Sequence, residues 1–196
     1  MYSLRTTNIV ILAQNHNPSI ATKDWLINNE IIDKNENIRH FVHTPAFSVI
    51  ETDIFSLTID PDRFQISLKR LDNESIKYLL KIVKGYISNL PETPYKALGI
   101  NYLYNVSMDK KKLKELFVGQ DKLYKELFGD DYSIGGIIGF KYDKFIVKLQ
   151  LKQTNDESIA DFNYHLNSKE EKELITGVDK YFGLKKQSEI ILEAIS

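Results

Sequence analysis

Two runs of alternating apolar and polar residues, joined by a four-residue turn, constrain this chain more than any other feature. The runs are Phe55–Ile59 and Phe64–Leu68. In the turn between them, Pro61 fixes φ at the second position and Asp60 can bond back to the turn backbone. One packed face and one polar face are typical of an antiparallel sheet covered on one side. The side chains expected in the core are Phe55, Leu57, Ile59, Phe64, Ile66 and Leu68.

The same order of elements occurs twice along the chain. Each half reads as a strand, a helix, three strands and a long helix. The apolar strand Asn8–Asn15 corresponds to Leu98–Asn105, and Phe55–Ile59 corresponds to Phe145–Leu149, both at an offset of about 90 residues. A repeated element order indicates an internal duplication.

This repeat predicts an α+β fold class in which duplicated β-α-β-β-β-α units form a largely antiparallel sheet with helices packed on one face. The chain would be a single domain, 1–196, with two pseudo-symmetric halves, 1–91 and 95–196. Residue identity between the halves is low. A chance repetition of element order, which α+β proteins often show, is the alternative.

The predicted element order resembles the saddle of the TATA-box-binding protein family and the duplicated ligand-binding domains of the GyrI-like type. A second resemblance is local, at Leu98–Asn105 (LGINYLYN) and the proline-containing linker before it. This segment resembles a mid-chain strand, Arg-Leu-Gly-Leu-Arg-Tyr-Ile-Asn, of a sporadically distributed bacterial family. Both arginines are absent here, since Ala97 precedes Leu98 and Asn101 stands at the second position. That family has no established activity, so the resemblance implies no catalytic residues.

Composition weakens several functional classes. The 26 Lys and Arg residues balance 27 Asp and Glu residues, for a net charge of -1. Duplex-DNA binders usually carry a basic excess, so this balance disfavours nucleic acid as a partner. The absence of cysteine excludes disulfides, thiol catalysis and Cys-ligated metals. No apolar run approaches the ~20 residues of a spanning helix, and Ile9–Ala13 is too short for a signal-peptide core. We expect a cytoplasmic protein with no membrane partner.

Three motifs are candidate sites in the sequence. His40 and His43 lie in a polar segment without a third ligand, so we predict no metal. Gly135-Gly136-Ile-Ile-Gly139 lacks the Lys-Ser/Thr of a phosphate loop, and reads as a closely packed or bulged strand. The loop around His16 reads as a helix-entry turn, with a functional loop as the alternative. No G-x-S-x-G elbow is present, although a spatial triad is not excluded by counting. We name no catalytic residue and no cofactor.

The polar face of the predicted sheet is the candidate binding surface. The alternative is a solvated face on which lysines serve solubility. The residues proposed to contact a partner are Lys69, Lys148, Gln150, Lys152, Asn163 and His165.

These observations predict a non-enzymatic binding or adaptor protein that acts on a protein partner through a sheet face or edge. One alternative is a small-molecule sensor, with a pocket between the halves lined by some of the 11 Tyr and 10 Phe residues. Another is nucleic-acid binding on the lysine-bearing face. An enzyme is the last alternative, and no reaction can be named for it.

Overall fold

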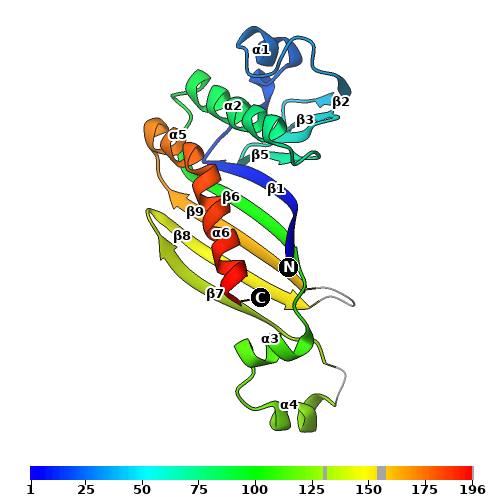
Figure 1. Cartoon of the computed structure of the whole chain (residues 1–196). Helices are drawn as coiled ribbons and strands as arrows, with labels where there is room; N and C mark the ends of the chain where they lie inside the picture. Colours follow the sequence, from blue (N-terminus) through cyan, green and yellow to red (C-terminus); the bar gives the residue numbers. More distant parts are fainter. Residues whose placement is uncertain (130–131, 154–157, 196) are drawn as a thin grey trace.

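The computed structural model describes residues 1–129, 132–153 and 158–195 (Figure 1). These residues form an α+β fold in which helices pack against a nine-stranded antiparallel sheet. The strands are β1 (Tyr2–Ala13), β2 (Ile38–His43), β3 (Ser48–Thr52), β4 (Phe55–Ile59), β5 (Arg63–Leu68), β6 (Tyr95–Val106), β7 (Gly135–Tyr142), β8 (Phe145–Gln153) and β9 (Ser158–Asn167). The helices are α1 (Lys23–Asn28), α2 (Asn73–Asn89), α3 (Lys110–Phe117), α4 (Asp121–Phe128), α5 (Glu171–Asp179) and α6 (Tyr181–Ile195), with a 3-10 turn, η1 (Pro18–Ile20).

The two 12-residue strands, β1 and β6, lie side by side in the sheet, whose order is β2-β3-β4-β5-β1-β6-β9-β8-β7. Outward from this pair, one direction runs through β5, β4 and β3, and the other through β9, β8 and β7. Strand β2 extends the first side by one strand. The sheet therefore has two edges, β2 and β7, and they come from different halves of the chain.

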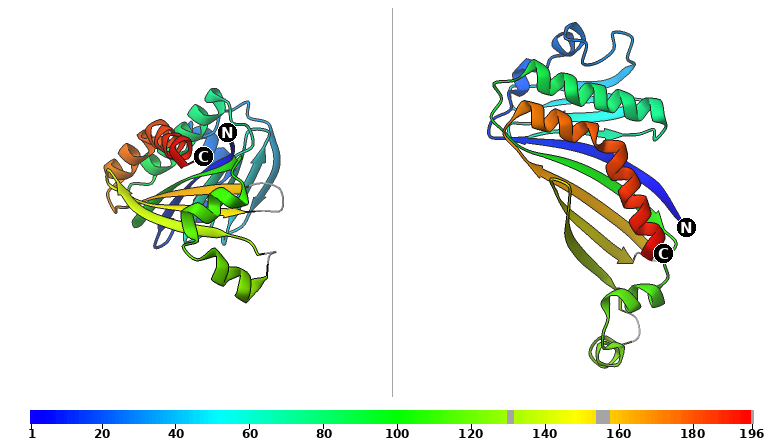
Figure 2. Two further views of the ribbon diagram at one scale, coloured as in Figure 1. Left: turned by 60° about the horizontal axis from the view of Figure 1, so that its bottom comes forward. Right: turned by 60° about the vertical axis from the view of Figure 1, so that its left-hand side comes forward.

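Helices α2, α5 and α6 cover one face of the sheet (Figure 2). Asp72 caps the start of helix α2, since its side chain accepts a hydrogen bond from the Ser75 amide at 2.8 Å. Its apolar stripe packs on the sheet, and α5 packs against both α2 and β6. We call the uncovered side the open face. Among the described residues, no helix has the length and apolar character needed to cross a bilayer.

The buried face predicted for Phe55–Ile59 and Phe64–Leu68 is confirmed. All six predicted core side chains of β4 and β5 are at most 5% exposed. Under α6, Tyr102 donates from its hydroxyl group to the Tyr181 carbonyl oxygen at 2.6 Å. The Tyr181 hydroxyl group in turn donates to Thr7 Oγ1 at 2.9 Å. The polar ends of these buried rings are therefore satisfied inside the core, as burial requires.

The polar composition of residues 33–45 predicts an irregular segment, but the structure places a strand in it. Residues Ile38–His43 form β2, which pairs with β3 and has a register shift between Ile38 and His40. The alternation within this segment is weak, because its side chains are only half-buried or exposed. Pairing with β3, rather than local pattern, makes it a strand.

The sequence predicts a helix from Thr22 to about Ile32 and a C-terminal helix bent near Gly177 or Gly183, and both helices end differently. Helix α1 ends at Asn28, because Glu30 takes a left-handed φ of 56° and turns Ile31 and Ile32 into the core. The C-terminal helix is broken at Lys180 into α5 and α6, rather than bent at a glycine.

The run Ser168-Lys169-Glu170-Glu171 predicts a capping box with Ser168 as the N-cap. It is not formed, since the N-cap of α5 is Glu170. The Ser168 hydroxyl oxygen accepts from the Glu170 amide at 3.1 Å and donates to Glu173 at 2.8 Å. Ser168 therefore still supports the start of this helix, but from two residues before its N-cap.

Candidate functional site

Five of the six predicted partner-binding residues come together on the open face. Lys148, Gln150 and Lys152 alternate along β8 with buried apolar side chains. Asn163 and His165 lie on the adjacent strand β9, with Asn163 directly opposite Lys148. We call these five residues the lysine strip.

Lys69 lies apart from the lysine strip, just after the end of β5. Three strands, β1, β6 and β9, separate β5 from β8. The Lys69 ammonium group pairs with Glu51 and donates to the Thr52 carbonyl oxygen at 2.8 Å. Burial raises the pKa of Glu51, but hydrogen bonds from Lys69 and Ser56 bring it below its ordinary value. Lys69 is thus paired within its own half and does not extend the strip.

A ladder of asparagine amides crosses the open face at the middle of the sheet. Asn163 Nδ2 donates to Asn101 Oδ1 at 2.5 Å, and Asn101 Nδ2 donates to Asn8 Oδ1 at 2.7 Å. These residues pair directly across β9, β6 and β1, and the row continues to Lys148 on one side and Ser67 on the other. The sequence analysis missed this ladder. The polar Asn8 and Asn101 inside two apolar strands are a signal, but only the register shows that they meet.

One carboxylate lies within the lysine strip. Asp161 on β9 is opposite Gln150, between Lys148 and Lys152. Burial raises the pKa of Asp161, and the two lysines oppose that rise. The carboxylate, when ionised, offsets one of the two ammonium charges, so this part of the face has little net positive charge.

The open face lacks aromatic stacking platforms. In the described strands, the Phe and Tyr rings lie on the helix-covered side, as the pairing of Tyr102 with Phe162 and of Phe140 with Val147 illustrates. The imidazoles of His40 and His165 are the aromatic rings that these strands place on the open face. Base stacking on aromatic side chains is the usual way to hold single-stranded nucleic acid, and this surface does not provide it.

His16, in the loop expected to be a helix-entry turn, is a buried structural residue. It is 1% exposed. Its Nε2 lies 3.1 Å from the Ile11 carbonyl oxygen, and its Nδ1 lies 3.0 Å from the Tyr86 hydroxyl group. Because a carbonyl oxygen only accepts, Nε2 carries the proton and Nδ1 accepts from Tyr86. The two ring nitrogens therefore hold the loop on α2 through Tyr86 and on β1 through Ile11.

Burial lowers the pKa of His16 below its ordinary value, although Ile11 and two nearby aspartates oppose this. The unfolded chain therefore takes up a proton near pH 6.5 while folded His16 resists it. We expect the free energy of unfolding to be unaffected by this group above pH 6.5 and to fall as the pH drops below that value. Urea unfolding over a pH series measures the effect. An NMR titration that placed the His16 transition at or above pH 6.5 would contradict it.

The two histidines considered as metal ligands point to opposite sides of β2. His40 pairs with Glu51 and His43 with Ser48, and these partners lie on different faces of β3. His43 Nδ1 lies 2.6 Å from Ser48 Oγ. Within the part of the chain that the structure describes, no three His, Asp or Glu side chains are grouped to hold a metal ion.

Helices α3 and α4 lie at one end of the sheet, beyond β7 (Figure 1). Helix α3 buries Leu113 against the core, whereas none of the eight residues of α4 is buried. Leu127 is 64% exposed and Phe128 is 60% exposed. We call the exposed apolar side chains of these helices the α4 patch: Leu116, Leu123, Tyr124, Leu127 and Phe128.

An aromatic and charged cluster holds α4 in place. Asp121 accepts from the Tyr132 hydroxyl group at 2.6 Å and pairs with Lys114. These hydrogen bonds hold the pKa of Asp121 down at about 2. The rings of Tyr124 and Phe128 lie 6.0 and 6.4 Å from the Tyr132 ring. Helix α4 is thus anchored on one side only, which leaves its apolar side chains toward solvent.

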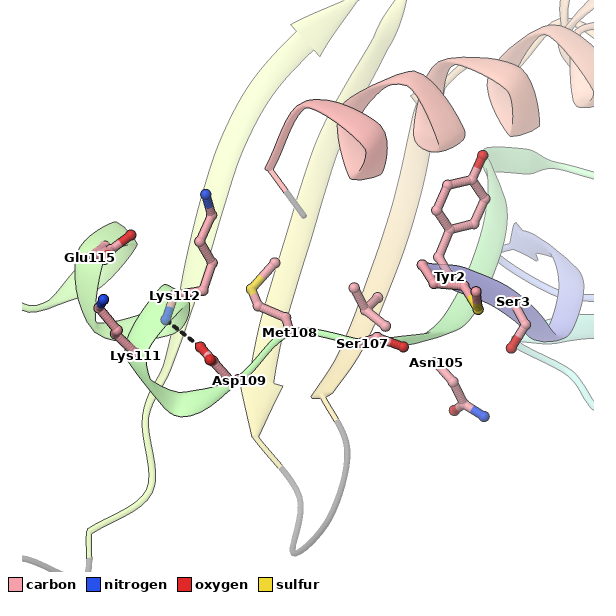
Figure 3. Close-up of a pocket in the computed structure, with 11 residues that line it drawn as sticks. Tyr2, Ser3, Asn105, Ser107, Met108, Asp109, Lys111, Lys112 and Glu115 are labelled. Carbon is pink, nitrogen blue, oxygen red and sulfur yellow. Dashed lines mark hydrogen bonds between the residues drawn. The ribbon is translucent and has the colours of Figure 1, made fainter.

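Two cavities adjoin this region. One, of about 340 Å³, is lined by Phe117, Val118, Tyr124, Phe128, Tyr132, Ser133, Ile134 and Gly135. The other, of about 850 Å³, lies between the start of β1, the end of β6 and α3 (Figure 3). Its lining mixes Tyr2, Ser3 and Met108 with charged side chains of α3. The larger cavity is lined by residues of both halves, but Tyr2 is the single aromatic residue in its lining. Farther along the seam, Tyr102 and Tyr181 pack with ring centroids 5.1 Å apart.

Comparison of the sequence with protein-family models and with curated proteins gave no match.

Proposed function

We propose that this chain is a non-enzymatic binding protein whose protein partner docks on the α4 patch, at the β7 end of the sheet. The observation that carries the proposal is that α4 buries none of its residues while it exposes Leu123, Leu127 and Phe128. Exposed apolar clusters on monomers usually mark interaction sites. A helix that contributes nothing to the core adds little stability to the fold, so its apolar side is better explained by a partner.

The partner is an apolar segment flanked by acidic residues. Helices α3 and α4 carry six lysines against three carboxylates. Two of the lysines, Lys114 and Lys125, already pair with Asp121. The excess of lysines over carboxylates on these two helices favours acidic groups at the rim of an apolar contact.

The lysine strip is a secondary contact surface in this proposal. Nucleic acid is the weaker alternative, because Asp161 offsets the charge of Lys148 and Lys152 and the described strands place no Phe or Tyr ring on this face. The net charge of -1 adds no long-range attraction to a polyanion. A protein partner makes better use of the ordered amides of the asparagine ladder.

A small-molecule ligand is the second candidate, favoured by the aromatic cavity of about 340 Å³ near α4. Its size and apolar lining suit a small ligand. Leu123 and Leu127 do not line it, so substitutions there separate the two functions. Replacing Phe117 or Tyr132, by contrast, would affect the cavity.

A double variant, Leu123→Asp with Leu127→Asp, tests the proposed function. Each lost apolar anchor is expected to cost ~2 kcal/mol of binding, or about 30-fold in affinity. The matched control is Ile190→Asp, which alters a 49% exposed side chain on α6. The wild type and both variants are immobilised and used in a pulldown from the native host. Proteins retained by the wild type and by Ile190→Asp, but not by the double variant, are purified and titrated against each variant by calorimetry.

The proposal requires a purified protein that binds the wild type directly and binds the double variant at least tenfold more weakly. It is wrong if every retained protein binds both variants equally. It is also wrong if a purified small molecule, and no protein, accounts for binding that Phe117→Ala abolishes.

We also infer that the halves 1–91 and 95–196 derive from a duplication. The matching strand orders outward from β1 and from β6 support this, as does the helix that follows each set of strands. The halves differ at β2 on one side and at α3–α4 on the other. The proposed binding surface therefore lies where the second half departs from the first.

A further inference from the structure

The two edges of the sheet are protected to different degrees. Strand β2 has six residues, a register shift near Arg39, and an ion pair of Arg39 with Asp53 at 2.9 Å. Strand β7 has eight residues, pairs with β8 without a register shift, and carries Lys141 as its single charged residue. Short, bulged and charged edges resist pairing with other strands, whereas long, regular, apolar edges invite it. In Figures 1 and 2, α3 and α4 lie near the start of β7, and no described element lies along the outer side of the rest of this strand.

The hairpin geometry identifies the backbone groups that face outward. Tyr142 and Phe145 flank the two-residue turn between β7 and β8, so they exchange hydrogen bonds with each other. The Gln153 amide also donates to the Ile134 carbonyl oxygen at 3.0 Å. Ile134 and Tyr142 are an even number of residues apart, so their backbone groups both point toward β8. Even-numbered residues of β7 thus bond to β8. The amide and carbonyl groups of Ile137, Gly139 and Lys141 point away from the sheet.

We propose that β7 pairs antiparallel with β7 of a second copy of this chain, about a twofold axis at Ile138. A symmetric pairing has to place the outward-facing, odd-numbered residues of β7 opposite each other. Two registers do so while pairing seven of the eight residues of β7, and they are centred on Ile138 and on Gly139. The register centred on Gly139 sets that glycine against itself. The register centred on Ile138 sets each glycine against a side chain: Gly135 faces Lys141, Gly136 faces Phe140, and Gly139 faces Ile137 of the other copy.

This register is favourable for packing and for charge. Cross-strand pairs of a large residue with glycine cover the backbone that glycine leaves bare. A Cβ at Gly136 would overlap the Phe117 ring, so only a glycine fits beneath that ring. In the dimer, Phe140 of the second copy adjoins the same glycine and extends the apolar contact with Phe117. Lys141 does not face another lysine, so no like charges are opposed.

The paired copies form one continuous sheet across the twofold axis. Ile137, 59% exposed in the single chain, and Ile138 lose solvent contact on opposite faces. The contact does not use the α4 patch. Dimerisation and the proposed partner binding are therefore separate properties.

Single cysteine variants test the pairing, since the chain has no cysteine of its own. Ile138 would face its own copy as a non-hydrogen-bonded pair, with Cα atoms ~4.5 Å apart, within disulfide range. The Ile138→Cys variant is expected to form a covalent dimer in oxidised glutathione. Gly139→Cys should not, because residue 139 faces Ile137. Ile146→Cys, on β8 and 51% exposed, is the matched control.

Sedimentation of the wild type is expected to show a concentration-dependent dimer. Amide exchange at Ile137, Gly139 and Lys141 should slow as the dimer forms, which tests the edge without any substitution. The Leu123→Asp, Leu127→Asp variant should remain dimeric. Cross-linking of Ile138→Cys no faster than Ile146→Cys, faster cross-linking of Gly139→Cys, or a wild type that is monomeric at all concentrations overturns the proposal. Each of these results leaves the partner-binding test of the α4 patch unaffected.

Discussion

Replacing Phe64 with alanine should lower the free energy of unfolding by about 3–5 kcal/mol. Phe64 is fully buried in β5, and its ring centroid lies 4.3 Å from that of Tyr86 on α2. Tyr86 also donates its hydroxyl hydrogen bond to His16. The substitution thus leaves a cavity at the point where α2, β5 and the loop after β1 meet.

Urea unfolding followed by circular dichroism measures this loss. Phe47→Ala is the control, because Phe47 lies in the loop before β3 and is exposed. Exposed substitutions usually change stability by no more than about 0.5 kcal/mol. A loss below about 1 kcal/mol for Phe64→Ala, far short of the cost of emptying a core site, would show that Phe64 does not occupy the core position described above.

Two glycines in successive helices are expected to respond in opposite ways to added side chains. A Cβ at Gly177 in α5 would lie 2.8 Å from Leu98 Cδ2 and 2.9 Å from Leu166 Cδ2. Both leucines are buried in the sheet, so they have little room to move. Gly177→Val should therefore destabilise the protein by ~1–3 kcal/mol through overpacking.

Gly183 in α6 has open space around it, since no atom lies within 4 Å of the point that a Cβ would occupy. Gly183→Ala should stabilise the protein by about 0.5–1 kcal/mol, because alanine loses less backbone entropy than glycine in a helix. Thermal unfolding of both variants gives the comparison. If Gly177→Val were as stable as the wild type, α5 would not sit directly on β6 and β9 as described.

The sequence predicts the fold well where pattern and local chemistry agree. Alternation in Phe55–Leu68 predicts the buried face correctly. The sequence also predicts a helix cap at Asp72 or Asn73 and another at Asp109, and the structure has caps at Asp72 and Asp109. Strand β2 is not predictable in this way, because its stability comes from β3 rather than from its own alternation. The break at Lys180 is also not predictable, since it depends on the tertiary packing of Tyr181, the buried first residue of α6.

The candidate site is less accessible to sequence reasoning. Alternation along β8 places Lys148 and Lys152 on the open face, but the separation of Lys69 from them depends on the strand order. The α4 patch escapes prediction because its leucines fit the helical spacing of a core-facing stripe. Whether the apolar side chains of a helix are exposed depends on which element packs against the helix, and the local sequence of α4 does not contain that information.

The pairing of β1 with β6 has a consequence for how the chain folds. Asn8 and Asn101 meet across this seam although 93 residues separate them in the chain. Closing so long a loop is entropically costly, and sheets with many distant pairings fold slowly. Where each half forms its own hairpins first, the inner edges of β1 and β6 stay unpaired until the seam closes. Because the seam joins strands from different halves, β1 of one molecule can close on β6 of another, and exchange of halves is the misassembly to expect when the chain refolds at high concentration.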